Sequence, residues 1–81
     1  MKKTSIEQFV IDKVKEKRIS LGISQAELAF RLNLSNGFIG KIESPKYNSK
    51  YNINHLNNLA MILQCSPKDF FPEKPLETKN G

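Results

Sequence analysis

Residues 24–43, SQAELAFRLNLSNGFIGKIE, constrain the fold more than any other part of the chain, because they predict two short helices joined by a three-residue turn. Ser24 is typical of a helix N-cap, since its hydroxyl can accept the backbone N–H three residues on, while Glu27 can reach back to the Ser24 amide in a capping box. Asn33 tolerates a left-handed backbone better than most residues and therefore predicts the turn. The segment is typical of a helix-turn-helix unit.

The second helix of this unit is predicted over residues 35–43, with Ser35 as its cap. Ile39 and Ile42 fall on one face at helical spacing and are expected to be buried. The opposite face is small and basic and carries Gly37, Gly40, Lys41 and Ser44. Two glycines in so short a helix cost about 1 kcal/mol each relative to alanine, which favours a role that requires close backbone approach. A solvated face that merely tolerates glycine is the alternative.

A face without bulky side chains suits a helix that lies in the major groove of DNA. Asn36 and Lys41 are the expected base-reading side chains, because Asn pairs well with adenine and Lys with guanine or phosphate. The net charge of +5 favours a polyanionic partner, since Lys and Arg that neutralise phosphates release condensed counterions. Charge alone does not separate DNA from RNA or from a membrane surface.

Residues 14–43, VKEKRISLGISQAELAFRLNLSNGFIGKIE, resemble the helix-turn-helix domain of the lambda-type phage repressor, Cro and Xre family. The resemblance extends over roughly residues 6–71. Its motifs keep near-constant spacing and are GISQ at 22–25, LA at 28–29, IE at 42–43 and LA at 59–60. Asn33 and Gln64 stand where the family often has glycine.

This resemblance implies an all-α fold, a compact five-helix bundle, in one domain over residues 1–71. The composition agrees, because 81 residues with 38% hydrophobic content suffice for one small core. Residues 72–81 are polar and predict a flexible C-terminal tail.

Three further helices are predicted around the helix-turn-helix unit, with Thr4, Asn52 and Ser66 as their caps. The expected apolar face of the first helix consists of Ile6, Phe9, Val10, Val14 and Leu21. That of the fourth helix consists of Ile53, Leu56, Leu59, Ala60 and Leu63. The short last helix is expected to bury Phe70 or Phe71.

The resemblance also implies roles for side chains around the second motif helix. Arg18 is expected to pair with Glu43 and so to fix the angle of that helix. Gln25 is expected to hold a DNA phosphate. The other expected phosphate contacts are Ser35, Phe38, Ser44, Lys46 and Lys50. Phe38 can instead touch a thymine methyl or shield the joint between helices, and the two tyrosines of residues 47–51 can meet nucleic acid or cover the core.

Enzymatic function is not expected from this sequence. His55 is the one histidine and has no acid or thiol at metal-ligand spacing, so it is interpreted as a solvated helix residue. No glycine-rich phosphate loop follows a predicted strand. The single cysteine, Cys65, is expected to pack as a small apolar residue. Neither a metal site nor a cofactor is predicted.

The sequence therefore predicts a sequence-specific regulator of transcription, a repressor, that binds double-stranded DNA as a homodimer on an inverted repeat. One alternative is the antitoxin of a toxin–antitoxin module, with a toxin protein as partner. Another is a protein-interaction module that no longer reads DNA. The chain has no apolar stretch long enough to span a bilayer and no signal peptide, so a cytoplasmic location without membrane contact is expected.

Overall fold

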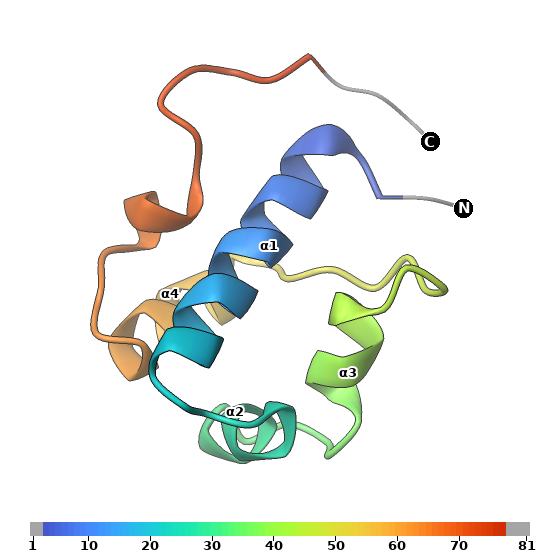
Figure 1. The fold of residues 1–81 in the computed structure, drawn as a ribbon, viewed down its shortest axis with the longest axis vertical. Helices are drawn as coiled ribbons and strands as arrows, with labels where there is room; N and C mark the ends of the chain where they lie inside the picture. The colour runs from blue at the N-terminus through green and yellow to red at the C-terminus, as the bar shows by residue number, and fades with distance from the viewer. Residues whose placement is uncertain (1–2, 78–81) are drawn as a thin grey trace.

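The computed structural model describes residues 3–77, which form four α-helices and one short 3-10 helix (Figure 1). The elements in chain order are α1 (Ser5–Ser20), α2 (Gln25–Arg31), α3 (Phe38–Glu43), α4 (Ile53–Ile62) and the 3-10 helix η1 (Pro67–Phe70). The predicted all-α fold is confirmed, and the fifth predicted helix is the 3-10 turn η1. Part of the predicted tail, residues 78–81, lies outside the described residues.

Helix α1 is the centre of the arrangement. Helices α3 and η1 both pack against α1, α2 packs against α3, and α4 packs against η1 (Figure 1). None of the helices in the described part of the chain has the length and apolar character needed to cross a membrane.

The predicted caps start their helices by local hydrogen bonds. Reciprocal capping boxes with the residue three positions on are formed by Thr4, Asn52 and Ser66. The Ser24 hydroxyl accepts the Glu27 N–H at 3.0 Å, as predicted. The Glu27 carboxylate, however, pairs with Arg31 one turn later, which differs from the capping box expected with Ser24. The starts of α1, α2, α4 and η1 are therefore set by sequence-local chemistry.

Three residues with a left-handed backbone follow the ends of α1, α2 and α4. These are Gly22 (φ 69°), Asn33 (φ 60°) and Gln64 (φ 59°). The amide after each of them donates to the carbonyl five residues back, at 2.9–3.0 Å, which is the Schellman arrangement. The positions at which the resembled family often has glycine thus require the backbone conformation that glycine adopts most easily.

Helix α3 is shorter than predicted, because it begins at Phe38 and not at residue 35. The N-cap is Gly37, and Ser35 lies in the preceding turn, where its carbonyl accepts the Phe38 N–H at 3.0 Å. The connection from α2 therefore spans residues 32–37 instead of three residues. Two physical reasons explain the difference: the left-handed Asn33 is followed by non-helical residues, and glycine loses more backbone entropy than other residues on entering a helix.

The core lies where α1, α2, α3, α4 and η1 meet. Its fully buried large side chains are Ile11, Val14, Leu28, Ile39, Ile42, Leu59 and Phe70. Phe71, the alternative to Phe70, is 44% exposed. Cys65 packs against the core from its edge, as expected, and burial raises the pKa of its thiol.

Two residues assigned to apolar core faces are exposed, and one unassigned residue is buried. Ile53 is 82% exposed because it is the first residue of α4. Side chains on a helix tilt toward its N-terminus, so the Ile53 side chain points beyond the edge of the core. Leu21 is 48% exposed because it follows the last residue of α1. Ile11, which the predicted stripe omitted, is 2% exposed, since segments distant in sequence cover more than one face of α1.

Candidate nucleic-acid interface

The second motif helix presents one side to the core and the other outward. Ile39 and Ile42 are fully buried. The predicted base-reading residues Asn36, Gly37 and Lys41 are exposed. Gly40 is half-buried. The structure thus brings three of these four residues to the surface at α3, and the fourth requires a separate explanation.

The carboxyl end of α3 is fixed to α1 by a buried ion pair between Arg18 and Glu43. Arg18 Nε and Nη2 donate to the two Glu43 carboxylate oxygens at 2.9 Å each. The third guanidinium nitrogen, Nη1, donates to the Ile23 carbonyl at 2.8 Å, just before α2. The two side chains are only 9% and 3% exposed. This planar, bidentate geometry fixes both distance and orientation, so it sets the angle of α3 relative to α1.

Gln25 joins the same carboxylate from α2. Its side-chain amide donates to Glu43 Oε1 at 2.9 Å. A Cβ atom at Gly40 would lie 3.2 Å from Gln25 Oε1, which is closer than ordinary packing. Gly40 therefore makes room for Gln25, a reason that the sequence analysis did not identify. By contrast, a Cβ atom at Gly37 would meet nothing within 4 Å.

The amino end of α3 is held by an aromatic cluster. Phe38 contacts His55 edge to face, with ring centroids 5.1 Å apart, and Tyr51 contacts the same His55 ring edge to face, with ring centroids 6.2 Å apart. His55 Nδ1 also accepts the Asn52 N–H at 3.0 Å, within the capping box of α4. His55 is a helix residue, as interpreted, but it is half-buried and not fully solvated, because its ring packs against Phe38 and Tyr51. The position of Phe38 favours shielding of the helix joint over contact with DNA.

Tyr51 is buried at its polar end. Among the described residues, its hydroxyl oxygen has no hydrogen-bond partner. Burial raises the pKa of the Tyr51 phenol well above its usual range, with the Glu43 carboxylate as a smaller cause in the same direction. This tyrosine therefore covers the core edge and is not placed to stack on bases. In residues 3–77, no group of three or more potential metal ligands lies together.

Two lysines lie beside the carboxyl end of α3. Lys41 Nζ lies 5.7 Å from the centroid of the Tyr47 ring, in cation–π geometry. Lys46 is exposed, and its backbone N–H donates to Ser44 Oγ at 3.2 Å. The turn that follows α3 thus adds a second exposed lysine.

Two other lysines connect this turn to the start of α1. Lys50 Nζ pairs with Glu7 Oε2 at 2.8 Å, and this bond, followed by the Thr4 N–H, lowers the pKa of the Glu7 carboxyl. Lys3 Nζ donates to the Ser44 carbonyl at 2.8 Å, at the C-cap of α3. The sequence analysis did not single out Lys3, since its partner is 41 residues away in the chain. Both contacts support structural roles for these lysines.

The fold and this surface define a helix-turn-helix protein whose second motif helix presents an exposed lysine, Lys41. A family model described as helix-turn-helix matches residues 14–70, and the chain belongs to this family. The resemblance to the lambda-type repressor, Cro and Xre class is thereby confirmed. The protein is a DNA-binding regulator of transcription and not an enzyme.

Two solved structures are similar to this chain. One is the restriction-modification controller protein C.AhdI from Aeromonas hydrophila, with 27% sequence identity and a TM-score of 0.65, covering 78% of this chain and 92% of that chain. The other is the hypothetical transcription factor NHTF from Neisseria, with 18% identity and a TM-score of 0.72, covering 84% of this chain and 76% of that chain. The second likeness shows the fold alone. Comparison with curated protein sequences gives no match.

Proposed function

We propose that the protein is a sequence-specific repressor that binds operator DNA with α3 in the major groove. The observation that carries this proposal is the buried Arg18–Glu43 ion pair, which fixes α3 while the outer side of that helix stays exposed. A helix held at a defined angle can bring its side chains to base edges in a fixed register, which sequence reading requires.

In this proposal, Asn36 and Lys41 read base edges. Gly37 lets the backbone approach the DNA, since the space around it is open. An amide group has two N–H bonds, so Gln25 can hold Glu43 and a phosphate oxygen at the same time. Lys46 is the principal phosphate-binding lysine.

Of the remaining predicted phosphate contacts, two are assigned to DNA and two to structural contacts within the protein. Ser35 and Ser44 lie in the turns that flank α3, where their hydroxyls suit phosphate oxygens. Lys50 is assigned to Glu7 and Phe38 to the aromatic cluster, because each already has a partner of matching chemistry in the structure.

Two copies of the chain are proposed to bind an inverted repeat in the cytoplasm, because one small domain offers a small DNA interface. The likeness to C.AhdI favours a more specific candidate, control of restriction and modification genes. An antitoxin would need a toxin partner, which co-purification from cells would detect.

The proposal is tested by selecting bound duplexes from a random pool at near-physiological salt and sequencing them. An enriched inverted repeat is expected. Lys41→Ala should lower preference at one base position, and Lys46→Ala should weaken all duplexes alike and reduce the salt slope by about 1. The matched control is Lys15→Ala, which removes the same charge from an exposed position on α1. Absence of enrichment, or equal effects of all three substitutions, would refute sequence reading by α3.

A further inference from the structure

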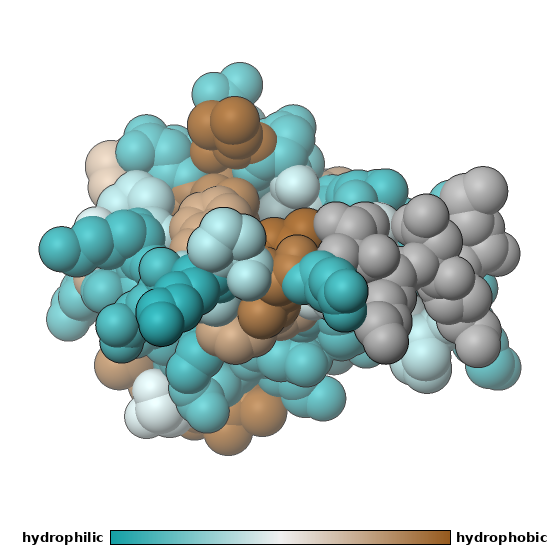
Figure 2. Space-filling view, turned by 90° about the horizontal axis from the view of Figure 1, so that it is seen from above, coloured by the Kyte–Doolittle hydropathy of each residue, from teal (hydrophilic) through white to brown (hydrophobic). Residues whose placement is uncertain are grey.

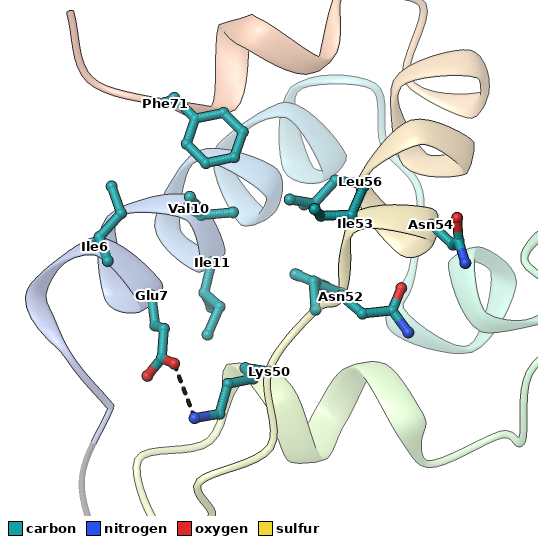
Figure 3. A pocket seen from close by; sticks show the side chains of 11 residues that line it. Ile6, Glu7, Val10, Ile11, Lys50, Asn52, Ile53, Asn54, Leu56 and Phe71 are labelled. Atoms are coloured by element: carbon teal, nitrogen blue, oxygen red, sulfur yellow. Dashed lines mark hydrogen bonds and ion pairs between the residues drawn. The ribbon is translucent and has the colours of Figure 1, made fainter.

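An apolar groove of about 670 Å³ lies between the first half of α1 and the start of α4. Ile6 and Val10 of α1 form one wall, and Ile53 and Leu56 of α4 form the other (Figure 3). Phe71 lies at one end of the groove. The Glu7–Lys50 ion pair lies at the opposite end.

The groove carries apolar surface that the single chain leaves in water. Ile53 is 82% exposed and Phe71 is 44% exposed, although both are large apolar side chains beside an apolar hollow. Seen from the end of the molecule at which α1 begins, apolar side chains form a broken patch within a mostly hydrophilic surface (Figure 2). Covering such surface is favourable roughly in proportion to the apolar area removed from water.

We propose that this groove is the surface on which a second copy of the chain binds, with Ile53 of each copy seated against the groove of the other. The inference rests on the proposed function, because an inverted repeat requires two copies related by a two-fold axis. It adds the surface and the anchoring residue through which the two copies associate.

Three observations favour a second copy as the occupant. A two-fold interface must be self-complementary, and this face carries both a projecting side chain, Ile53, and the hollow that can receive one. Its rim carries one acidic and one basic side chain, Glu7 and Lys50, so a two-fold axis can place opposite charges across the interface. The groove is lined by residues of α1, of α4 with the segment before it, and by Phe71, so it leaves α2 and α3 available to DNA.

The size of the molecule agrees with this arrangement. Its extents are 32 × 27 × 21 Å. Two copies packed side by side have their centres about one molecular width apart, which is comparable to one turn of DNA, about 34 Å. The two copies of α3 can then enter successive major grooves on one side of the duplex.

The test compares Ile53→Gln with Met61→Gln. Both positions lie on α4, both side chains are exposed (82% and 68%), and neither substitution changes the net charge. Met61 is outside the groove lining and serves as the matched control. Circular dichroism and thermal unfolding check that both variants keep the fold. Sedimentation equilibrium then measures the dimer dissociation constant.

Ile53→Gln is expected to raise that constant at least about tenfold, because each dimer loses two buried isoleucines, while Met61→Gln stays within about twofold of the wild type. On DNA, Ile53→Gln should keep the wild-type affinity for a single half-site. Its affinity for the full inverted repeat should fall at least about tenfold.

A wild-type chain that remains monomeric at about 0.5 mM and binds two half-sites independently would overturn the proposal, and a different protein would then be the occupant to seek. So would a dimer that Ile53→Gln leaves intact. If the wild type forms a dimer sensitive to Ile53→Gln but binds no duplex, the proposed function fails and the groove assignment stands.

Discussion

The Arg18 guanidinium and the Glu43 carboxylate form two N–H···O bonds of 2.9 Å each, which join the last turn of α1 to the end of α3. Glu43 also accepts a bond from Gln25, so one carboxylate connects α1, α2 and α3. The orientation of α3, the proposed DNA-reading helix, therefore depends on a single buried acid.

Glu43→Ala is expected to destabilise the fold by about 3–5 kcal/mol, because it leaves the Arg18 charge buried without its partner. Urea unfolding measures the change. The double substitution Arg18→Met with Glu43→Leu should recover most of the loss, since apolar residues of similar volume need no counter-charge. A loss below about 0.5 kcal/mol for Glu43→Ala would show that the pair contributes no more than an exposed one.

Gly40→Ala is expected to reduce DNA affinity with little change in stability. The added Cβ displaces Gln25, at a cost of about 0.5–1.5 kcal/mol for its bond to Glu43, while alanine favours the helix by about 1 kcal/mol over glycine. A double-mutant cycle with Gln25→Ala provides the control. Once Gln25 is truncated, Gly40→Ala should stabilise the protein by about 1 kcal/mol. Equal effects in both backgrounds would mean that the two residues are not coupled.

Gln64→Gly is expected to stabilise the protein by about 0.5–1 kcal/mol. Gln64 has φ 59°, a conformation that costs residues with a Cβ about 1–2 kcal/mol, part of which is offset by the greater freedom of glycine in the unfolded chain. Gln64→Ala keeps the Cβ and should change the free energy of unfolding little. Thermal unfolding of both variants separates backbone strain from loss of the glutamine side chain. If loss of the side chain were the cause, Gln64→Gly and Gln64→Ala would change stability alike.

The Glu7–Lys50 ion pair should contribute stability that depends on pH. The pKa of Glu7 is lowered from its usual 4.5 in the folded protein, chiefly by Lys50, so its contribution is present above that value and is lost as the pH falls through the lower folded pKa. Glu7→Gln keeps an acceptor for the capping box and removes the charge. The wild type should be more stable than Glu7→Gln at neutral pH, and the difference should disappear in acid.

Denaturant midpoints between about pH 2 and pH 7 measure this difference. The control is the same substitution in a Lys50→Met background, where the difference at neutral pH should be smaller. A difference that does not change with pH would exclude the ion pair as its cause.

Tyr51→Phe is expected to leave stability unchanged or to raise it by up to about 1 kcal/mol. The hydroxyl is buried and unpaired within the described part of the chain, and removal of such a group avoids its desolvation cost. Tyr47→Phe, at a ring that is 47% exposed, is the comparison and should have almost no effect. A loss of more than about 1 kcal/mol for Tyr51→Phe would show that its hydroxyl forms a bond in solution.

Local sequence chemistry predicted much of the fold. Thr4, Asn52 and Ser66 cap helices because their side chains bond to amides three or fewer residues away, a geometry that needs no distant contact. Asn33 adopts the left-handed backbone that its position in the pattern predicted. The boundary of α3 was predicted less well, because Ser35 offers a cap at one residue while Gly37 disfavours helix two residues later. Where two weak local preferences conflict in this way, packing against the rest of the fold determines where the helix begins.

By itself, the sequence determined that this chain is an all-α helix-turn-helix protein with a positive charge suited to DNA, since caps, apolar spacing and charge are properties of short segments. Only the tertiary structure decided which distant groups meet. Gln25 packs on Gly40, Lys3 bonds to the Ser44 carbonyl, and Ile53 is left beside an open groove. Such contacts depend on the angles and distances between whole helices, which are set by the packing of the entire core and not by any local pattern.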